Sequence, residues 1–165
     1  WSESDLVVTE CLRAGIWDGL DAAELAAVVS TMVYEARRDE RLGDRLPTGA
    51  VRDALAAATR IWGELAADEA AVGLPTSREP ELGFVWIAYR WARNDSLDKV
   101  LAAASQAGAP MPAGDFVRWC KQLLDLLEQI ASVPAAGSTS SALAVQARTA
   151  ARLIRRGVVA QSMQP

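Results

Sequence analysis

Several residue types on which enzymes and metal sites depend are absent or scarce in this chain of 165 residues. It contains no histidine and only two cysteines, Cys11 and Cys120. Without histidine, neither a Ser-His-Asp nor a Cys-His catalytic arrangement can form, and two distant cysteines do not match the ligand spacing of a zinc site. No phosphate-binding loop of the form G-x-x-x-x-G-K-[ST] occurs. We therefore expect no catalytic residue, no metal site and no cofactor in this chain itself.

Long apolar runs are also missing. No apolar run approaches the roughly 18 residues of a membrane span, and the N-terminal residues do not have the layout of a signal peptide. We expect a soluble, cytoplasmic domain with no membrane partner. Each cysteine lies within an apolar helical pattern, which favours two small buried side chains in a reducing compartment over a disulfide or a reactive thiol.

Charge is unevenly distributed along the chain. The net charge is −4, but residues 1–112 hold 11 basic and 18 acidic residues, whereas residues 113–165 hold six basic and three acidic ones. A domain that held nucleic acid by electrostatics alone would be basic overall. This chain is instead expected to add a local basic surface to a larger assembly.

The hydrophobic pattern is helical throughout, without an alternating strand or an internal repeat. It predicts an all-α, single-domain bundle of about seven helices over residues 1–165. The second helix begins at a capping box formed by Asp21 and Glu24 and is expected to continue to Arg38. The other six are expected at about 4–13, 48–72, 80–93, 96–107, 114–131 and 142–156.

The helix expected at 114–131, "GDFVRWCKQLLDLLEQIA", is apolar on almost every side. One polar line nevertheless follows its full length, formed by Arg118, Gln122, Asp125 and Gln129. These positions are spaced at i, i+4, i+7 and i+11, so they share one face of a helix. Such a line predicts either a ligand-facing surface, a solvent groove or a contact with a neighbouring domain.

Aromatic and basic residues provide two further candidate surfaces. "GFVWIAYRWARN" places aromatic rings beside Arg90 and Arg93, which suits either base stacking or the filling of an alanine-rich core. Near the C-terminus, Arg148, Arg152, Arg155 and Arg156 share one helical stripe and form a candidate phosphate-facing surface. The arginines at 37, 38, 41 and 45 alternate with acidic residues and fit a solvated ion-pair network equally well.

Four blocks in a fixed order extend this picture: "LRAGIWDGLDAAELAAVVSTMVYEARRDE", "VWIAYRWARNDSLDKVL", "AGDFVRWCKQLLDLLEQIA" and "RRGVVA". Together they resemble the DSHCT domain, the helical C-terminal bundle of superkiller/exosome-type DExH-box RNA helicases, most closely its bacterial HelY-type branch. The resemblance covers nearly the whole chain. It implies a C-terminal piece of a larger ATP-dependent helicase whose RecA-like ATPase domains, which would bind ATP and Mg²⁺, lie outside this chain.

In that family the bundle guides the single strand that leaves the RecA-like core, and one of its helices, the ratchet helix, lies against the strand. The resemblance implies single-stranded RNA as the ligand, with DNA not excluded. It also implies the RecA-like and winged-helix domains of the same chain as partners, and an RNA-degrading nuclease as a further candidate. The candidate nucleic-acid-binding residues are Glu35, Arg38, Arg118, Lys121 and Gln122.

The resemblance is incomplete at two positions. Gln122 stands where exosome-type eukaryotic members carry a basic residue, and Asn94 stands where glycine is common in a turn. Asparagine tolerates the left-handed backbone of such a turn.

Two alternatives to RNA guidance follow from the residues. The first is a protein-interaction bundle that docks onto the helicase core or a nuclease partner without touching RNA. The second is a helical regulator that holds a small molecule in an apolar cavity among Trp62, Trp86, Trp91 and Trp119. At the level of single residues, Glu35 is equally able to pair with Arg38, and Arg118 with Asp115 or Gln122.

Overall fold

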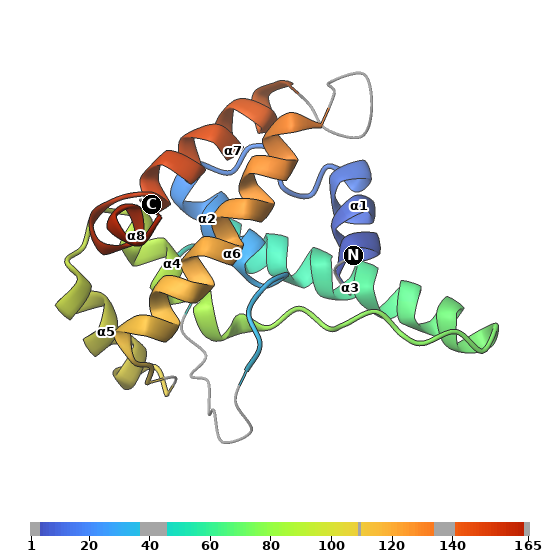
Figure 1. Ribbon diagram of the computed structural model, residues 1–165. Coiled ribbons are helices and arrows are strands. Elements are labelled where there is room, and N and C mark those ends of the chain that lie inside the picture. The colour runs from blue at the N-terminus through green and yellow to red at the C-terminus, as the bar shows by residue number, and fades with distance from the viewer. Residues whose placement is uncertain (1–3, 37–45, 109, 134–140, 164–165) are drawn as a thin grey trace.

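The computed structural model describes residues 4–36, 46–108, 110–133 and 141–163, and all regular structure within them is helical (Figure 1). The predicted all-α bundle is therefore confirmed. The helices are α1 (Asp5–Ala14), α2 (Ala22–Ser30), α3 (Gly49–Ala71), the 3-10 turn η1 (Leu82–Phe84), α4 (Val85–Ala92), α5 (Leu97–Gln106), α6 (Ala113–Ser132), α7 (Ser141–Ile154) and α8 (Gly157–Ser162). None of these helices is long and apolar enough to cross a bilayer.

Helix α2 lies at the centre of the bundle and packs against α3, α4, α6 and α7. Every residue of α2 except Glu24 is buried, which a short helix of Ala, Val and Leu achieves because small side chains allow close approach on all sides. Its start is fixed by the predicted capping box. The Asp21 carboxylate accepts from the Glu24 amide at 2.8 Å, and the Glu24 carboxylate accepts from the Asp21 amide at 3.1 Å.

The interior is connected by a continuous series of aromatic rings. Trp91 of α4 packs edge-on against Phe116 of α6, Phe116 stacks near Phe84, and Phe84 stacks near Tyr34. Tyr34 then meets Trp119 edge-on, with ring centroids 5.1 Å apart. Large rings fill the space that an alanine-rich set of helices leaves between them. The series joins the end of α4 to the segment that follows α2.

The segment from 73 to 81 runs back along α3 towards the centre of the molecule (Figure 1). Two side chains of α3 hold it there: the indole Nε1 of Trp62 donates to the Ser77 carbonyl at 2.8 Å, and the Glu69 carboxylate accepts from the Ser77 amide and hydroxyl. This segment delivers Arg78 to the end of α2.

The structure differs from the predicted helices in two places. The second helix ends at Ser30 rather than continuing to Arg38, because the two carbonyls just beyond Ser30 accept from a distant segment of the chain. The Glu81 amide donates to the Thr31 carbonyl, and Arg78 donates to that of Met32. The last predicted helix, 142–156, is α7, which ends two residues early at Ile154. A further short helix that was not predicted, α8, begins at Gly157, whose φ of 52° is left-handed. Asn94 has φ 72°, as the sequence predicts.

Candidate nucleic-acid interface

The polar line on α6 is exposed along its whole length. All four of its residues are exposed: Arg118, Gln122, Asp125 and Gln129. The opposite side of α6 is buried and consists of Phe116, Cys120, Leu123, Leu124, Leu127 and Ile130. In the described part of the chain, the side chains of Gln122, Asp125 and Gln129 make no hydrogen bond or ion pair. The line is therefore open to a ligand.

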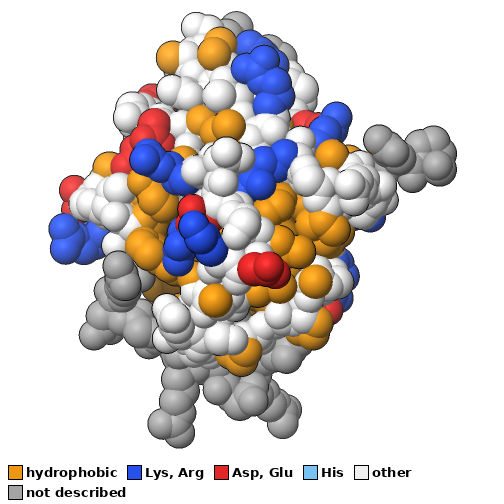
Figure 2. All heavy atoms as spheres, turned by 90° about the vertical axis from the view of Figure 1, so that its left-hand side faces the viewer, with side chains coloured by type: hydrophobic (Ala, Val, Ile, Leu, Met, Phe, Trp, Pro, Cys, Tyr) orange, Lys and Arg blue, Asp and Glu red, His pale blue; other side chains and the backbone are white. Residues whose placement is uncertain are grey.

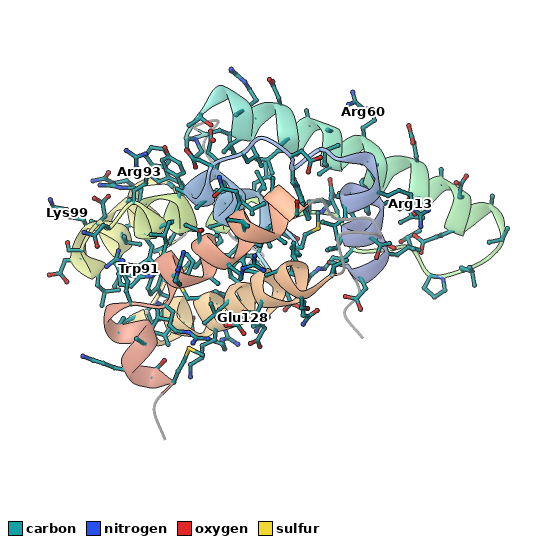
Figure 3. All side chains as sticks on the ribbon, turned by 90° about the horizontal axis from the view of Figure 1, so that it is seen from above. Arg13, Arg60, Trp91, Arg93, Lys99 and Glu128 are labelled. Carbon is teal, nitrogen blue, oxygen red and sulfur yellow. The ribbon has the colours of Figure 1, made fainter. Side chains whose placement is uncertain are left out.

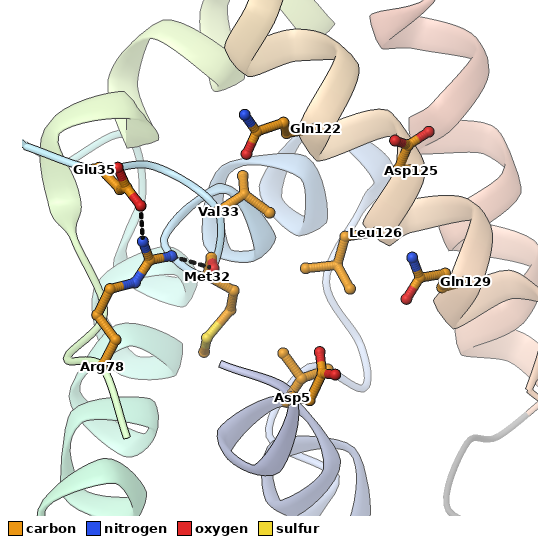
Figure 4. A pocket seen from close by; sticks show the side chains of 10 residues that line it. Asp5, Met32, Val33, Glu35, Arg78, Gln122, Asp125, Leu126 and Gln129 are labelled. Carbon is orange, nitrogen blue, oxygen red and sulfur yellow. Dashed lines mark hydrogen bonds and ion pairs between the residues drawn. The ribbon is translucent and has the colours of Figure 1, made fainter. Parts of the chain in front are cut away.

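Three of these residues line a groove of about 330 Å³ between α6, the segment after α2, α1 and Arg78 (Figure 4). We call it the acidic groove, because the described residues that line it include three carboxylates and a single cationic side chain. Its lining residues are Asp5, Val8, Met32, Val33, Glu35, Arg78, Gln122, Asp125, Leu126 and Gln129. Figure 4 shows the polar ends of Gln122, Asp125 and Gln129 along one wall, and Glu35 with Arg78 on the opposite side.

Glu35 stands on the extended segment after α2, not on the helix itself as predicted. Its neighbour Tyr34 is buried among aromatic rings and anchors this segment. The Glu35 side chain is 69% exposed and accepts from Nη1 of Arg78 at 2.9 Å. Nη2 of the same guanidinium donates to the Met32 carbonyl at 2.8 Å. One carboxylate oxygen of Glu35 is thus paired with Arg78, while most of the side chain is exposed to solvent.

Arg118 lies in a second hollow, of about 200 Å³, which we call the Arg118 pocket. Tyr34, Glu35, Ala36, Met111, Asp115, Arg118 and Trp119 line it. The Arg118 guanidinium carbon lies 4.8 Å from the centre of the Trp119 ring, and Nη2 is 3.6 Å from the Asp115 carboxylate. The side chain remains 59% exposed, so a flat guanidinium with spare N–H donors is presented to solvent.

Glu35 belongs to both hollows, and this joins the predicted residues into one surface. Glu35 meets Arg118 in the Arg118 pocket and Gln122 in the acidic groove. Lys121 is half-buried on α6 and lines neither of them. Arg38, like Arg37, Arg41 and Arg45, lies outside the described residues. The structure therefore brings together three of the five predicted contact residues.

The arginine stripe near the C-terminus divides into two parts. Arg148, Arg152 and Arg155 are exposed and line a groove of about 310 Å³ between α6 and α7, which we call the arginine groove. Arg155 pairs there with Glu128 of α6, which Figure 3 places on the outer side of that helix. Arg156, predicted to share the same stripe, does not line this groove, because the helical hydrogen bonds of α7 continue only to Arg155 and Arg156 is the N-cap residue of α8.

Arg156 points into the protein, where it joins α8 to the end of α4. Its Nη2 donates to the carbonyls of Trp91 and Asp95, each at 2.6 Å, and its Nε donates to the same Trp91 carbonyl at 3.2 Å. The guanidinium also lies over the Trp91 ring at 3.5 Å. Burial lowers the pKa of Arg156, while Asp95 acts in the opposite direction. These contacts give Arg156 a structural role between α8 and the end of α4.

The aromatic residues of α4 also divide into two groups. Phe84 and Trp91 are buried, and the Trp91 indole donates to the Ile154 carbonyl at 2.9 Å. Trp86 and Tyr89 are half-buried and stack on each other, with Arg90 and Arg93 beside their rings. Trp62 is bound to the segment at 73–81. The four tryptophans of the small-molecule hypothesis thus occupy separate places.

The two cysteines are buried and unpaired with each other. Burial raises the pKa of the Cys11 thiol to about 12 and also raises that of Cys120. Both thiols are therefore neutral at physiological pH and inert as nucleophiles. The prediction of two small buried side chains is confirmed.

Arg78 is the residue of this surface that the sequence analysis missed. It lies in "PTSREP", a polar stretch without helical spacing, and its partners are 43 and 46 residues away. Its Nε is buried without a hydrogen-bond partner in the described residues. No local signal predicts such a long-range contact.

Comparison with known proteins places this chain in a family. The family model described as the DSHCT (NUC185) domain matches residues 1–162. The proteins named "Probable helicase HelY" from Mycobacterium tuberculosis (strain ATCC 25618 / H37Rv) and from Mycobacterium leprae (strain TN) are each 48% identical over 166 residues. The match covers 97% of this chain but only 18% of those proteins. The chain belongs to the DSHCT (NUC185) domain family.

Proposed function

We propose that this chain is the strand-guiding helical module of an ATP-dependent RNA helicase. The observation that carries the proposal is the joined surface at α6, where the exposed polar line meets Glu35 in two adjoining hollows. The relatives named as helicases are several times longer than this chain. ATP and Mg²⁺ would bind the RecA-like domains of the complete protein, and this bundle would dock against those domains and the winged helix.

The chemistry of the two hollows supports different contacts to one strand. The acidic groove repels phosphate, because Asp5, Glu35 and Asp125 outnumber its single arginine. Carboxylates and amides instead accept hydrogen bonds from the amino and imino groups on base edges. Arg118 offers an exposed guanidinium beside this groove and suits a phosphate or the face of a base. The strand would place its bases towards the acidic groove and its backbone towards Arg118.

A rigid surface of this kind guides a strand without performing chemistry. The α6 residues are fixed by a packed helix, and Glu35 is fixed by Arg78 and by the aromatic series beneath Tyr34. ATP-driven motion of the RecA-like domains would advance the strand, while these contacts limit backward slippage. Lys121, half-buried beside the polar line, and Arg38 would add positive charge to the same approach.

The test uses the complete helicase with the double substitution Glu35→Ala, Arg118→Ala. We expect RNA-stimulated ATP hydrolysis and unwinding to fall by about tenfold or more, the scale of one or two lost charge-assisted contacts, while RNA-independent hydrolysis is unchanged. The matched control is Arg60→Ala, Glu64→Ala, which removes one charge of each sign from exposed positions on α3. Circular dichroism and thermal melting verify folding of both variants.

Equal unwinding by the wild type and the Glu35, Arg118 variant would refute strand guidance by this surface. The same assay on matched RNA and DNA strands separates the two ligands, because only RNA offers a 2′-hydroxyl to the amides of α6. A nuclease partner is tested separately, by co-purification with the complete helicase.

A further inference from the structure

The arginine groove takes no part in the proposed contacts to the strand, and its lining differs from that of the acidic groove. Its lining combines three exposed arginines, one carboxylate and small apolar side chains: Glu128, Ala131, Val145, Arg148, Thr149, Ala151, Arg152 and Arg155. Val145 is 53% exposed and adds an aliphatic side chain to the same lining as the arginines. The groove lies between α6 and α7, on helix surfaces that do not line the acidic groove.

We propose that the arginine groove binds an acidic amphipathic helix of a protein partner, one that presents carboxylates one turn apart around an aliphatic side chain. This proposal is independent of strand guidance. The occupant is inferred from charge complementarity and from the apolar wall. On another face of the molecule, the side of α5 and α8, basic side chains are likewise separated by hydrophobic surface (Figure 2).

The arginines have the spacing that a helical partner requires. Arg148 and Arg152 are one turn apart on α7, about 6 Å along the axis, and Val145 lies one turn before Arg148. Carboxylates at i and i+4 of a partner helix match this spacing and accept paired N–H donors from each guanidinium. An aliphatic side chain between them would rest on Val145, Ala131 and Ala151.

The present partners of these arginines are weak enough to exchange. Nη1 of Arg148 reaches the Ala131 carbonyl at 3.4 Å, and Nη2 of Arg152 reaches the Thr149 hydroxyl at 3.4 Å. Both distances are at the long limit for a hydrogen bond. Arg155 is already neutralised by Glu128, so two guanidinium groups are left for a partner.

The apolar wall favours a peptide over a nucleic-acid backbone. A phosphodiester chain carries a charge at every nucleotide and offers no aliphatic group to Val145. It would also face the Glu128 carboxylate. An acidic amphipathic helix can place its carboxylates at Arg148 and Arg152 only, and its apolar side chain against the wall.

The test measures binding of a fluorescein-labelled synthetic helix, with Glu at i and i+4 and Leu at i+3 in each repeat, to the complete protein by fluorescence anisotropy. Arg148→Glu, Arg152→Glu should weaken binding by about tenfold or more. The control Arg52→Glu, Arg60→Glu makes the same charge change at exposed positions on α3 and should leave binding within about twofold.

A second variant separates a peptide site from a phosphate site. Val145→Ser removes an exposed aliphatic group, so it should not disturb folding, and it should weaken peptide binding by about threefold. A labelled 20-nucleotide oligouridylate should be insensitive to the same change. The Glu35→Ala, Arg118→Ala variant should bind the peptide like the wild type, which separates this result from the outcome for strand guidance.

Three results would overturn the proposal. The first is absence of peptide binding at low salt. The second is a peptide affinity that is unchanged both by Val145→Ser and by Arg148→Glu, Arg152→Glu. The third is loss of oligouridylate binding in the Arg148, Arg152 variant while the peptide is unaffected, which would assign the groove to a phosphate backbone.

Discussion

Helix α6 borders two grooves of similar size and opposite charge. The acidic groove contains three carboxylates and one arginine, and the arginine groove contains three arginines and one carboxylate. The difference does not come from α6 alone, because its exposed polar line carries one acidic and one basic residue. It comes from the elements that face α6: the N-terminus of α1 and the segment after α2 on one side, and α7 on the other.

The comparison shows how one buried helix supports two unrelated surfaces. The leucines of α6 fill the core, and each exposed edge takes its chemistry from a different neighbour. The arginines of the two grooves differ in the same way. Arg78 is held by a backbone carbonyl and a carboxylate, whereas Arg148 and Arg152 make only long contacts. Arg78, with two short contacts, fixes the shape of its groove, whereas Arg148 and Arg152 have N–H donors that a ligand can bind.

The largest expected effect is on the free energy of unfolding, through a core substitution in α6, the helix that borders both grooves. Leu124 is fully buried on α6, and Leu124→Ala leaves a cavity that lowers the free energy of unfolding by about 2–5 kcal/mol. Leu74→Ala makes the same truncation at an exposed position and should change it by less than about 0.5 kcal/mol. Urea titration followed by circular dichroism measures both. A cost below about 1 kcal/mol for Leu124→Ala would show that α6 does not brace the two surfaces.

A smaller effect on the free energy of unfolding is expected at Arg156, just beyond the arginine groove. Arg156→Ala removes three hydrogen bonds to buried carbonyls and the contact with Trp91, so the free energy of unfolding should fall by about 2–3 kcal/mol. Arg152→Ala, four residues earlier, should cost less than about 0.5 kcal/mol. Arg156→Lys should recover only part of the loss, because one ammonium cannot replace the planar fork. Equal costs for both alanine variants would contradict the division between Arg152 and Arg156.

Much of this architecture is accessible from local patterns in the sequence. The Asp21 and Glu24 capping box, the buried side of α6 and its exposed polar line follow from spacing within one helix, and the structure has all three. The left-handed turn at Asn94 follows from a single residue. Periods of 3.6 residues are local, so they are readable without knowing the partner of a helix.

What escaped prediction depends on contacts between distant segments. The second helix ends early because Arg78 and Glu81 bind carbonyls beyond Ser30, and neither lies near α2 in the sequence. Arg156 continues the spacing of the arginine stripe, yet it turns inward because Gly157 permits the bend and Trp91 receives the guanidinium. Helical spacing identifies a shared face only as far as the helix extends.

The smallest expected effects separate the two grooves by charge alone. Asp125→Asn removes the charge of an exposed side chain in the acidic groove and keeps its size and one acceptor oxygen. Oligouridylate affinity should therefore rise by about twofold as repulsion of phosphate is relieved. Binding of the acidic helix should be unchanged. Arg152→Gln in the arginine groove should do the reverse, lowering peptide affinity by about threefold and leaving oligouridylate affinity within error.

Anisotropy titrations of both probes at low and at physiological salt measure this crossed pattern, because exposed charges lose most of their influence as ionic strength rises. If each variant shifted both probes equally, the two grooves would act as one electrostatic surface. A crossed result that fades with salt assigns the strand to one side of α6 and the protein partner to the other.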